Sequence, residues 1–435
     1  MSSALTQSAR VVDWLTNVRP GWPTTTLGRV GRFHMGTTFP HAYQGVTQGD
    51  LPFIKVSDFP RADHLGVLSG ANNWVDRQTA RQLGARIVPR GSILYARVGA
   101  ALLLNQRCIT GRTCIVDDNV RAFEPEHGDP RYWRYLMLLL DMAKITNPGP
   151  VPSVSERQVA ALPVPLPTVE EQRRIADFLD AEIKKLARIE LLSSKVSCLL
   201  GERQASLLSN CFSSRTTEAD GALPVNLALR RVVNRWIDYR GATPEKTVSG
   251  VPLVTAKNIR DGKIDMAASR EYIAEDAYSD WMRRGLLMRG DVLLTTEAPL
   301  GQVAMVDDPG VALAQRVIVL RADQRFCSPE WLYWYLRSPH GQAELELRAT
   351  GSTALGIKAD RLRGVPIPVF KPAEAKERLA QLQSQVSQIE SLQGELSRQR
   401  ALIAERRQAL ITAAVTGQFD VSTTSGRHVT DGVTA

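Results

Sequence analysis

The sequence predicts an α+β protein with two pseudo-symmetric α/β domains and two long helices that pair as an antiparallel coiled coil. An apolar series from Leu179 to Leu207 steps by seven residues, and a second series from Leu382 to Leu410 repeats it 203 residues later. The roughly 150 residues before each series have the short apolar runs and turn residues that are typical of strands in a globular domain. Each half of the chain is therefore expected to contain one domain and one long helix.

Motifs upstream of the two helices recur in the same order, which indicates an internal duplication. They comprise a buried strand with proline at its second position, an Arg-Gly turn into an apolar strand, an aromatic helix begun by proline, and a proline-punctuated extended segment. The matched pairs are LPFIKVSDF and VPLVTAKNI, VPRGSILYA and LMRGDVLLT, DPRYWRYL and SPEWLYWYL, and LPVPLP and VPIPVF. A protein with such two-fold symmetry suits a target that presents two half-sites.

Changes in residue composition along the chain set the predicted boundaries. The N-terminal segment, with VVDWL, is expected to be helical, and the Ser/Thr/Gly-rich tail has the composition of a disordered segment. The expected parts are an N-terminal helical segment 1–20, a first domain 21–166, a central helix 167–212, a linker 213–221, a second domain 222–370, a distal helix 371–417 and a flexible tail 418–435.

Composition restricts the class of protein. The chain has 435 residues, of which 43% are hydrophobic, so it can bury the cores of two or three domains. It has no apolar run of the length that a membrane helix needs and no signal-peptide pattern at its start, so we expect a cytoplasmic protein. Five scattered cysteines without a C-x-x-C pair fit a reducing compartment. The net charge of +9 favours a polyanionic partner.

The two long helices are expected to form a coiled coil with polar residues at some core positions. Glu182, Ser193 and Arg203 interrupt the first apolar seam, and such residues fix register at a cost in stability. A helix packed only on its own domain is the alternative, but helices in that role usually have about 8–20 residues. Forty-four residues give a rod of roughly 66 Å. The predicted seam residues are Ile175, Leu179, Leu186, Ile189, Val196, Leu200, Leu207, Leu382, Ile389, Leu396, Ile403 and Leu410.

The sequence contains no pattern from which a catalytic site could be assembled. A P-loop for nucleotide phosphates is absent, as are an H-E-x-x-H motif and any Cys/His cluster for a metal. NPGP at Asn147 differs from the Asn-Pro-Pro-aromatic loop of adenine methyltransferases. None of the six histidines has a matching histidine in the other repeat. We therefore expect a non-catalytic protein that needs no metal or other cofactor.

Three segments carry a resemblance to a known family: GDLPFIKVSDF, TNPGPVPSVSERQVAALPVPLPTVEEQRRIADFLD and ERRQALITAAVTGQFDV. With them, the chain from about Gly21 to Val421 resembles the DNA-specificity subunit of type I restriction–modification systems, in the family's order of recognition domain, helix, recognition domain, helix. The second helix start departs from the pattern, since Ala375 stands where the first copy has Gln172. The resemblance implies two target-recognition domains, each reading half of an interrupted sequence in double-stranded DNA. It also implies that the helices dock DNA adenine methyltransferase subunits, expected to be two, and through them motor-nuclease subunits.

Polar residues at the ends of apolar strands are the candidates for DNA contact, because base edges are read by hydrogen-bonding side chains and loops at strand ends carry function. For Ser57, Asn258 and Thr295 a local role in turn hydrogen bonding is the alternative. The candidates in the first domain are Lys55, Ser57, Arg97, Asn147 and Ser153, and those in the second are Thr255, Lys257, Asn258, Thr295, Thr296, Ser352, Thr353 and Lys358.

Two further groups of residues have alternative interpretations. The aromatic residues of the paired helices, Tyr132 with Tyr135 and Trp331 with Trp334, are expected in the core rather than stacked on bases. The arginines Arg81, Arg86 and Arg90 are either a solvated surface or a face toward DNA.

Two other functions remain open at the level of sequence. One is a coiled-coil scaffold that does not bind DNA. The other is a specificity subunit of a methylation-only or phage-defence complex, which the sequence cannot separate from full restriction because the nuclease is another polypeptide. A protein that mimics DNA would be acidic, and the basic charge of this chain counts against that class.

Overall fold

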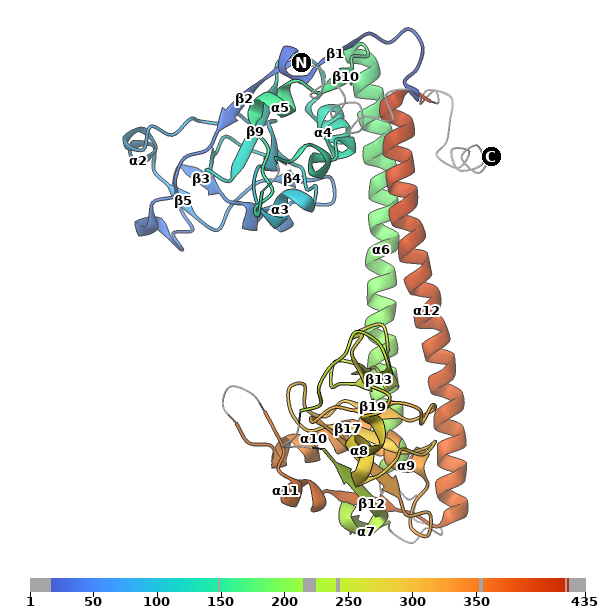
Figure 1. Cartoon of the computed structure of the whole chain (residues 1–435). Coiled ribbons are helices and arrows are strands. Elements are labelled where there is room, and N and C mark those ends of the chain that lie inside the picture. The colour runs from blue at the N-terminus through green and yellow to red at the C-terminus, as the bar shows by residue number, and fades with distance from the viewer. Residues whose placement is uncertain are drawn as a thin grey trace. The chain divides into compact units, whose positions relative to one another are not determined.

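The computed structural model describes residues 17–147, 149–213, 224–239, 243–351, 355–418 and 421 (Figure 1). Most of the predicted N-terminal segment, the predicted linker apart from Ser213, and most of the predicted tail lie outside them, as do the candidates Ser352 and Thr353. The chain forms two compact units, Met1–Ser194 with Ser397–Ala435, and Lys195–Leu396. Each unit thus combines one predicted domain with part of each long helix, while the boundaries drawn from the sequence stay predictions.

The domain of the first unit contains two larger sheets and a separate pair of strands. A five-stranded sheet has the order β2-β9-β6-β7-β4, a three-stranded sheet has the order β5-β3-β8, and β1 pairs with β10. Its strands are β1 (Thr24–Thr26), β2 (Gly31–Met35), β3 (Leu51–Ile54), β4 (Val67–Leu68), β5 (Trp74–Val75), β6 (Ile93–Ala96), β7 (Cys108–Thr110), β8 (Ile115–Val116), β9 (Val120–Pro125) and β10 (Pro163–Pro165), and its α-helices are α2 (Arg77–Gln82), α3 (Ala100–Leu103), α4 (Pro130–Leu139) and α5 (Glu156–Ala160).

The domain of the second unit repeats this plan. The order β12-β20-β17-β18 corresponds to β2-β9-β6-β7, β16-β13-β19 corresponds to β5-β3-β8, and β11 with β21 corresponds to β1 with β10. Its strands are β11 (Val225–Ala228), β12 (Val233–Asp238), β13 (Val251–Val254), β14 (Ile259–Arg260), β15 (Lys263–Ile264), β16 (Tyr272–Ile273), β17 (Val292–Thr295), β18 (Val303–Met305), β19 (Ala312–Leu313), β20 (Val317–Ala322) and β21 (Pro366–Val369), and its helices are α7 (Leu229–Val232), α8 (Tyr278–Trp281), α9 (Pro329–Arg337), α10 (Pro339–Arg348) and α11 (Ala359–Arg363). The predicted duplication is confirmed at the level of topology.

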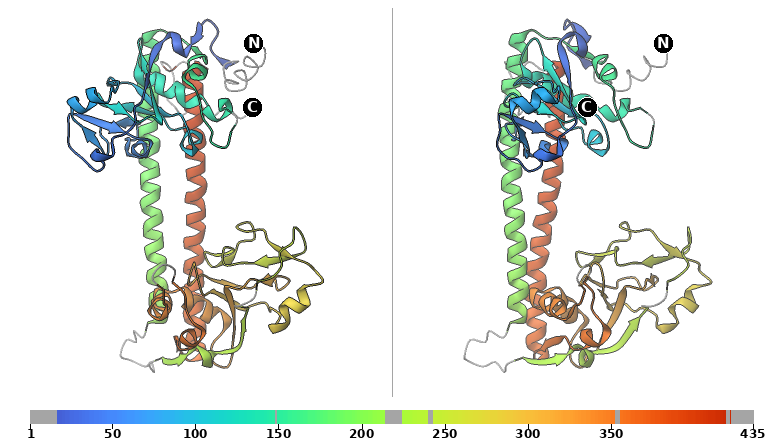
Figure 2. Two further views of the ribbon diagram at one scale, coloured as in Figure 1. Left: turned by 60° about the vertical axis from the view of Figure 1, so that its left-hand side comes forward. Right: turned by 90° about the vertical axis from the view of Figure 1, so that its left-hand side faces the viewer.

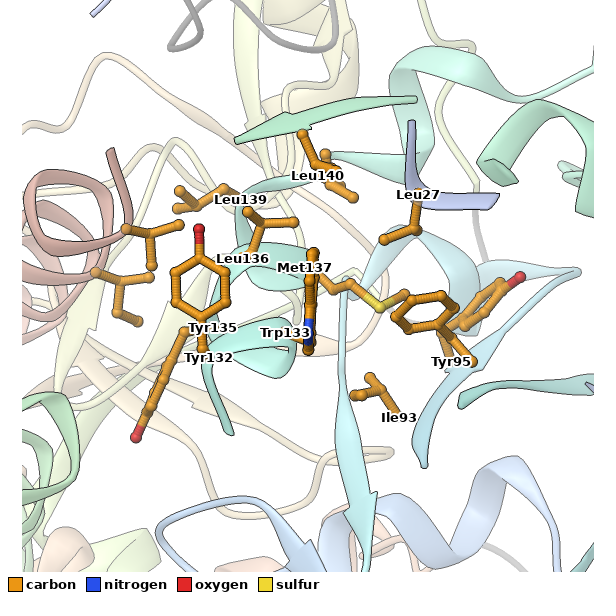
Figure 3. Packing of buried hydrophobic residues seen from close by; sticks show 14 of the residues in the cluster. Leu27, Ile93, Tyr95, Tyr132, Trp133, Tyr135, Leu136, Met137, Leu139 and Leu140 are labelled. Carbon is orange, nitrogen blue, oxygen red and sulfur yellow. The ribbon is translucent and has the colours of Figure 1, made fainter. Parts of the chain in front are cut away.

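The paired aromatic helices lie in the cores, as the sequence predicts. Tyr132, Trp133 and Tyr135 of α4 are fully buried and pack with Ile93 and Tyr95 of β6 (Figure 3). In the second unit α9 buries Trp331, Trp334 and Tyr335 in the same way, with Trp331 at 1% exposure and Phe212 against it at 4.7 Å between ring centroids. These residues are therefore structural and are not available to stack on bases.

The two long helices, α6 (Val169–Phe212) and α12 (Pro372–Thr416), pack together (Figure 2), which confirms the predicted fold class. In the first unit Glu190 accepts a hydrogen bond from Arg407 at 2.9 Å, and Ser193 donates one to Gln399 at 3.1 Å. Because the residue number rises along α6 while it falls along α12, the helices are antiparallel. The cores of both domains continue into them, through Leu179 and Leu410 in the first unit and Leu208 and Leu382 in the second.

The seam of the coiled coil departs from the prediction at two positions. Ile189 is 39% exposed and Val196 is 45% exposed. In a straight α-helix, residues spaced by seven rotate by about 20° per heptad around the helix axis. Such a row therefore leaves the interface after a few heptads, and the row that starts one residue later takes its place. The second row of α6 accordingly passes from Ala176 and Ile183, both buried, to Glu190, which pairs with Arg407.

The other predicted seam residues lie at or beside the interface, and Glu182 and Ser193 are buried within it, as expected for polar interruptions. The buried seam residues are Ile175, Leu179, Leu186, Leu382, Ile389, Ile403 and Leu410, and the half-buried ones are Leu200, Leu207 and Leu396.

Among the described residues, no helix combines the length and the apolar character that crossing a membrane requires.

Candidate nucleic-acid interface

The candidate site in each domain is one edge of the sheets, where the loops that follow three strands meet. In the first domain β3 and β8 are parallel neighbours, so both end at this edge. The N–H of Asp117 donates to the carbonyl of Ile54 at 2.9 Å, and the N–H of Arg97 donates to the carbonyl of Asn119 at 3.0 Å. The loops after β3, β6 and β8 are thereby joined by backbone hydrogen bonds, and we call this set the loop edge.

The loop edge of the second domain has the same backbone plan. β13 and β19 are parallel neighbours, and the N–H of Ala314 donates to the carbonyl of Val254 at 2.9 Å. The N–H of Thr296 donates to the carbonyl of Arg316 at 3.1 Å. Thr296 thus takes the place of Arg97, and Arg316 takes the place of Asn119. Because the register pairs Ala96 with Val120 and Thr295 with Val317, this correspondence does not depend on loop length.

The predicted Gly/Pro loops close against the loop edge in both domains. Asn147 and Ser153 form an isolated bridge, and Ser153 also pairs with Val98, next to Arg97. In the second domain Thr350 bridges Gly356, which also pairs with Glu297. The sequence prediction that these two loops are equivalent is confirmed by this shared pairing. Ser352 and Thr353 belong to the second loop and lie outside the described residues.

The candidates of the first domain lie at this edge with polar groups available to solvent. The ammonium of Lys55 lies 3.3 Å above the ring of Phe39 and donates to Gln44 at 3.1 Å. Ser57 and Asn147 are exposed, and Arg97 and Ser153 are half-buried. The Nε of Arg97 donates to the carbonyl of Asp118 at 2.9 Å, and this bond holds the guanidinium beside the loop after β8.

Arg97 also has a cationic neighbour. Burial and then the positive charge of Arg97 lower the pKa of Arg121, which lies on β9 beneath the edge. The two guanidinium groups repel each other, while the charges of Glu156 and Asp118 act on the pKa of Arg121 in the opposite direction. A nearby polyanion would relieve the repulsion.

The second loop edge contains a cavity of about 210 Å³. Thr255 and Lys257 from the loop after β13 line it, together with Gln315 and Arg316 from the loop after β19. The ammonium of Lys246 lies 2.7 Å from the carboxylate of Glu271 at its wall. Lys257, Lys358 and Arg316 are exposed, so this edge is polar and carries charges of both signs.

Three of the sequence candidates in the second domain are turn residues rather than surface residues. Asn258 is fully buried: its side-chain oxygen accepts from the N–H of Thr255 at 2.9 Å, and its amide donates to the carbonyls of Asp265 and Ser269. Thr295 is fully buried and donates to the carbonyl of Pro299 at 2.5 Å. Thr296 is also buried, and its hydroxyl lies 3.5 Å from the carbonyl of Arg316.

These three side chains are buried, and their hydrogen bonds fit a role in the turns rather than direct contact with DNA. A polar side chain at a strand end satisfies the backbone of the turn that follows, and it is buried by that role. In the first domain Asp58, at the position equivalent to Asn258, is likewise fully buried and accepts from the N–H groups of Lys55 and Asn72.

Three further residues of the loop edges, Asn119, Gln315 and Arg316, are not singled out by the sequence. They follow strands of only two residues, Ile115–Val116 and Ala312–Leu313, which are too short to show a period. The signal that could have found them is the pairing of the repeats, since both segments precede a longer strand at corresponding places. Among the described residues, no group of three or more His, Cys, Asp or Glu side chains could hold a metal ion.

Arg81, Arg86 and Arg90 are all exposed. They lie on and after α2, away from the loop edge in sequence and outside the set of backbone contacts that defines it. Their exposure agrees with both interpretations that the sequence left open.

Comparisons with known proteins agree with the geometry. A family model described as the type I restriction modification DNA specificity domain matches residues 20–193. The specificity subunit of the type I restriction enzyme EcoBI from Escherichia coli is 21% identical over 436 residues, covering 94% of this chain and 88% of that protein.

Solved structures share the fold over nearly the whole chain. One chain, from a study of complex assembly and conformational transition in a type I restriction–modification system, has a TM-score of 0.69 at 18% identity, covering 92% of this chain and 99% of its own. The HsdS subunit of Thermoanaerobacter tengcongensis has a TM-score of 0.50 at 18% identity, covering 92% of this chain and 98% of its own.

The family model, the full-length relative and the shared fold agree with the motifs that the sequence carries. They favour a DNA-specificity subunit over a scaffold that does not bind DNA. Residues 20–193 match the family model of the type I restriction modification DNA specificity domain, and the chain as a whole is similar to specificity subunits of type I restriction–modification systems.

Proposed function

We propose that the chain recognises a bipartite, asymmetric sequence in double-stranded DNA, with one half-motif read at each loop edge. The observation that supports this most directly is the repeated backbone plan of the two edges with different side chains on it. Arg97 and Asn119 in the first domain correspond to Thr296 and Arg316 in the second. Two loop edges with the same backbone but different hydrogen-bonding side chains would select different bases.

The surface of α6 supports a role in docking adenine methyltransferase subunits. Leu191, Leu192 and Leu199 are 49%, 46% and 62% exposed. On α12, Leu392 and Leu402 are 48% and 63% exposed. Large apolar side chains gathered on an exposed helix favour a protein partner. The family implies two methyltransferase subunits in this position, and motor-nuclease subunits bound through them.

The long helices are further proposed to set the distance between the half-motifs. Helices of 44 and 45 residues correspond to rods of roughly 66 Å at 1.5 Å per residue. Half-sites on one face of B-DNA are separated by about 34–36 Å or multiples of it. A rod of this length can span such a separation.

Reconstitution of the complex tests DNA recognition by this chain. A methyltransferase subunit that forms a complex with the chain is purified with and without it, and binding to the DNA motif that this complex methylates is measured over a range of salt concentrations. We expect specific binding only with the chain present, and a steep fall of the logarithm of affinity with the logarithm of salt concentration. Specific binding by the methyltransferase alone would contradict the proposal.

Lys257→Ala and Arg289→Gln form a matched pair in the same assay. Both side chains are exposed, but Lys257 lines the second loop edge and Arg289 precedes β17 at its opposite end. If Lys257 contacts a phosphate, its loss weakens binding uniformly across sequences and reduces the salt slope by about 1, whereas Arg289→Gln leaves both unchanged.

A further inference from the structure

Arg316 lies on the second loop edge, in the turn between β19 and β20, and no sequence motif singles it out. Its carbonyl accepts from the N–H of Thr296 at 3.1 Å, and its neighbour Val317 begins β20. The backbone of Arg316 is therefore held by the same strand ends that build the sheet. Side chains that project from a rigid element are more precisely placed than those on a free loop.

The side chain of Arg316, in contrast, is available to a ligand. It is 53% exposed, and its nearest acid is Glu297 at 3.8 Å, a carboxylate that is itself 51% exposed. A surface pair at this distance is weak and is easily exchanged for a better partner. Gln315 and Arg316 also line the cavity of about 210 Å³ that Thr255 and Lys257 border.

The combination of Arg316 with Glu297 suits base edges better than phosphates. A carboxylate is repelled by the phosphate backbone, so its presence beside a DNA-facing arginine disfavours a pure phosphate contact. In the major groove, arginine donates two hydrogen bonds to O6 and N7 of guanine, and glutamate accepts from N4 of cytosine. The two side chains together match the groups that one G·C pair displays.

Building on the proposed function, we propose that Arg316 and Glu297 read a G·C pair in the half-motif of the second domain. Arg316 donates to the guanine and Glu297 accepts from the cytosine. The equivalent position in the first domain is the exposed Asn119, and asparagine pairs with adenine rather than guanine. The same backbone site then reads different bases in the two halves, which yields an asymmetric motif.

The test is methylome sequencing of a host in which the chain is replaced by Arg316→Gln, Arg316→Lys or Glu297→Gln within the intact complex. Exchange of residues 222–370 for those of a relative first identifies the half-motif of the second domain. We expect that half-motif to contain a G·C pair that becomes degenerate in Arg316→Gln, while the other half-motif and the spacer stay the same. Affinity for the original target should fall about 10- to 100-fold.

Arg316→Lys separates geometry from charge. Lysine keeps the positive charge but loses the planar two-donor fork, so we expect relaxed specificity at the same position. Glu297→Gln should weaken discrimination at that same base pair. Arg289→Gln, at the opposite end of β17, should leave the motif intact, and thermal unfolding of each variant checks that it folds.

Three results would overturn the assignment of Arg316. They are a second half-motif without a G·C pair, an unchanged motif in Arg316→Gln with binding weakened uniformly across sequences, and a change in the first half-motif. Each of these leaves DNA recognition by the chain in place. Specific binding by the methyltransferase without the chain would instead remove the proposed function itself.

Discussion

Asn258 and Lys257 are neighbours in the chain with opposite environments. Asn258 is fully buried and bonds the turn after β13, whereas Lys257 is exposed and borders the cavity of the second loop edge. The sequence predicts that both lie at a strand end, because the apolar run VPLV stops just before them. It does not tell which of two adjacent polar residues turns inward, since that depends on the path of the turn.

Asn258→Ala is expected to lower the free energy of unfolding by about 1–3 kcal/mol, because the N–H of Thr255 and the carbonyls of Asp265 and Ser269 lose their partner. Lys257→Ala is the matched control and should stay within about 0.5 kcal/mol. Denaturant unfolding of the full chain measures both. A stable Asn258→Ala protein with an altered DNA motif would show that the side chain reads DNA after all.

At the scale of elements, the heptad pattern predicts the two long helices and their antiparallel pairing, but not the full seam. The predicted seam runs from Ile175 through Glu182 to Ile189. In the structure, the row that faces α12 instead continues from Ile183 to Glu190. A residue period identifies a helix, but the face that it buries depends on how far the helix drifts against its partner. Strands as short as β8 and β19 carry no period at all, and for this reason Asn119 and Arg316 are invisible from the sequence.

Each long helix contains one interior glycine, Gly201 in α6 and Gly394 in α12. A methyl group added at either position meets no atom within 4 Å, so packing does not require glycine there. Since glycine in a helix interior costs about 1 kcal/mol relative to alanine, Gly201→Ala and Gly394→Ala should each raise the free energy of unfolding by about that amount.

Gly128→Ala is the contrasting variant. Gly128 has a φ of +90°, and an added Cβ would overlap the side chain of Gln172. This substitution should lower the free energy of unfolding. Circular dichroism during thermal unfolding compares the three variants, and a destabilised Gly201→Ala would contradict the packing described for α6.

For the molecule as a whole, the duplication was readable from the sequence because motif order survives even where identity does not. The equivalence of the two loop edges needed the structure, since it rests on backbone pairs such as Arg97 with Asn119 and Thr296 with Arg316. These pairs join segments that differ in both length and residue type between the repeats. The similarity to specificity subunits of type I systems extends over nearly the whole chain and therefore covers both repeats.

Shortening both long helices by one heptad should shorten the spacer between the half-motifs. Removal of Leu186 to Leu192 together with Ile389 to Glu395 keeps the two rods equal in length and shortens each by about 10 Å. Against 3.4 Å per base pair, the tolerated spacer should fall by up to about three base pairs, with both half-motifs unchanged. Methylome sequencing of the double deletion measures it, and an active complex with the original spacer would leave the helices only a docking role.

Exchange of a single domain decides whether each domain reads one half of a bipartite motif. Residues 21–166 are replaced by the corresponding segment of a relative with a different target, and the methylome of a host carrying the hybrid complex is sequenced. We expect one half-motif to change to that of the relative, while the other half-motif and the spacer length stay as they were. A change in both half-motifs, or in neither, would contradict this expectation.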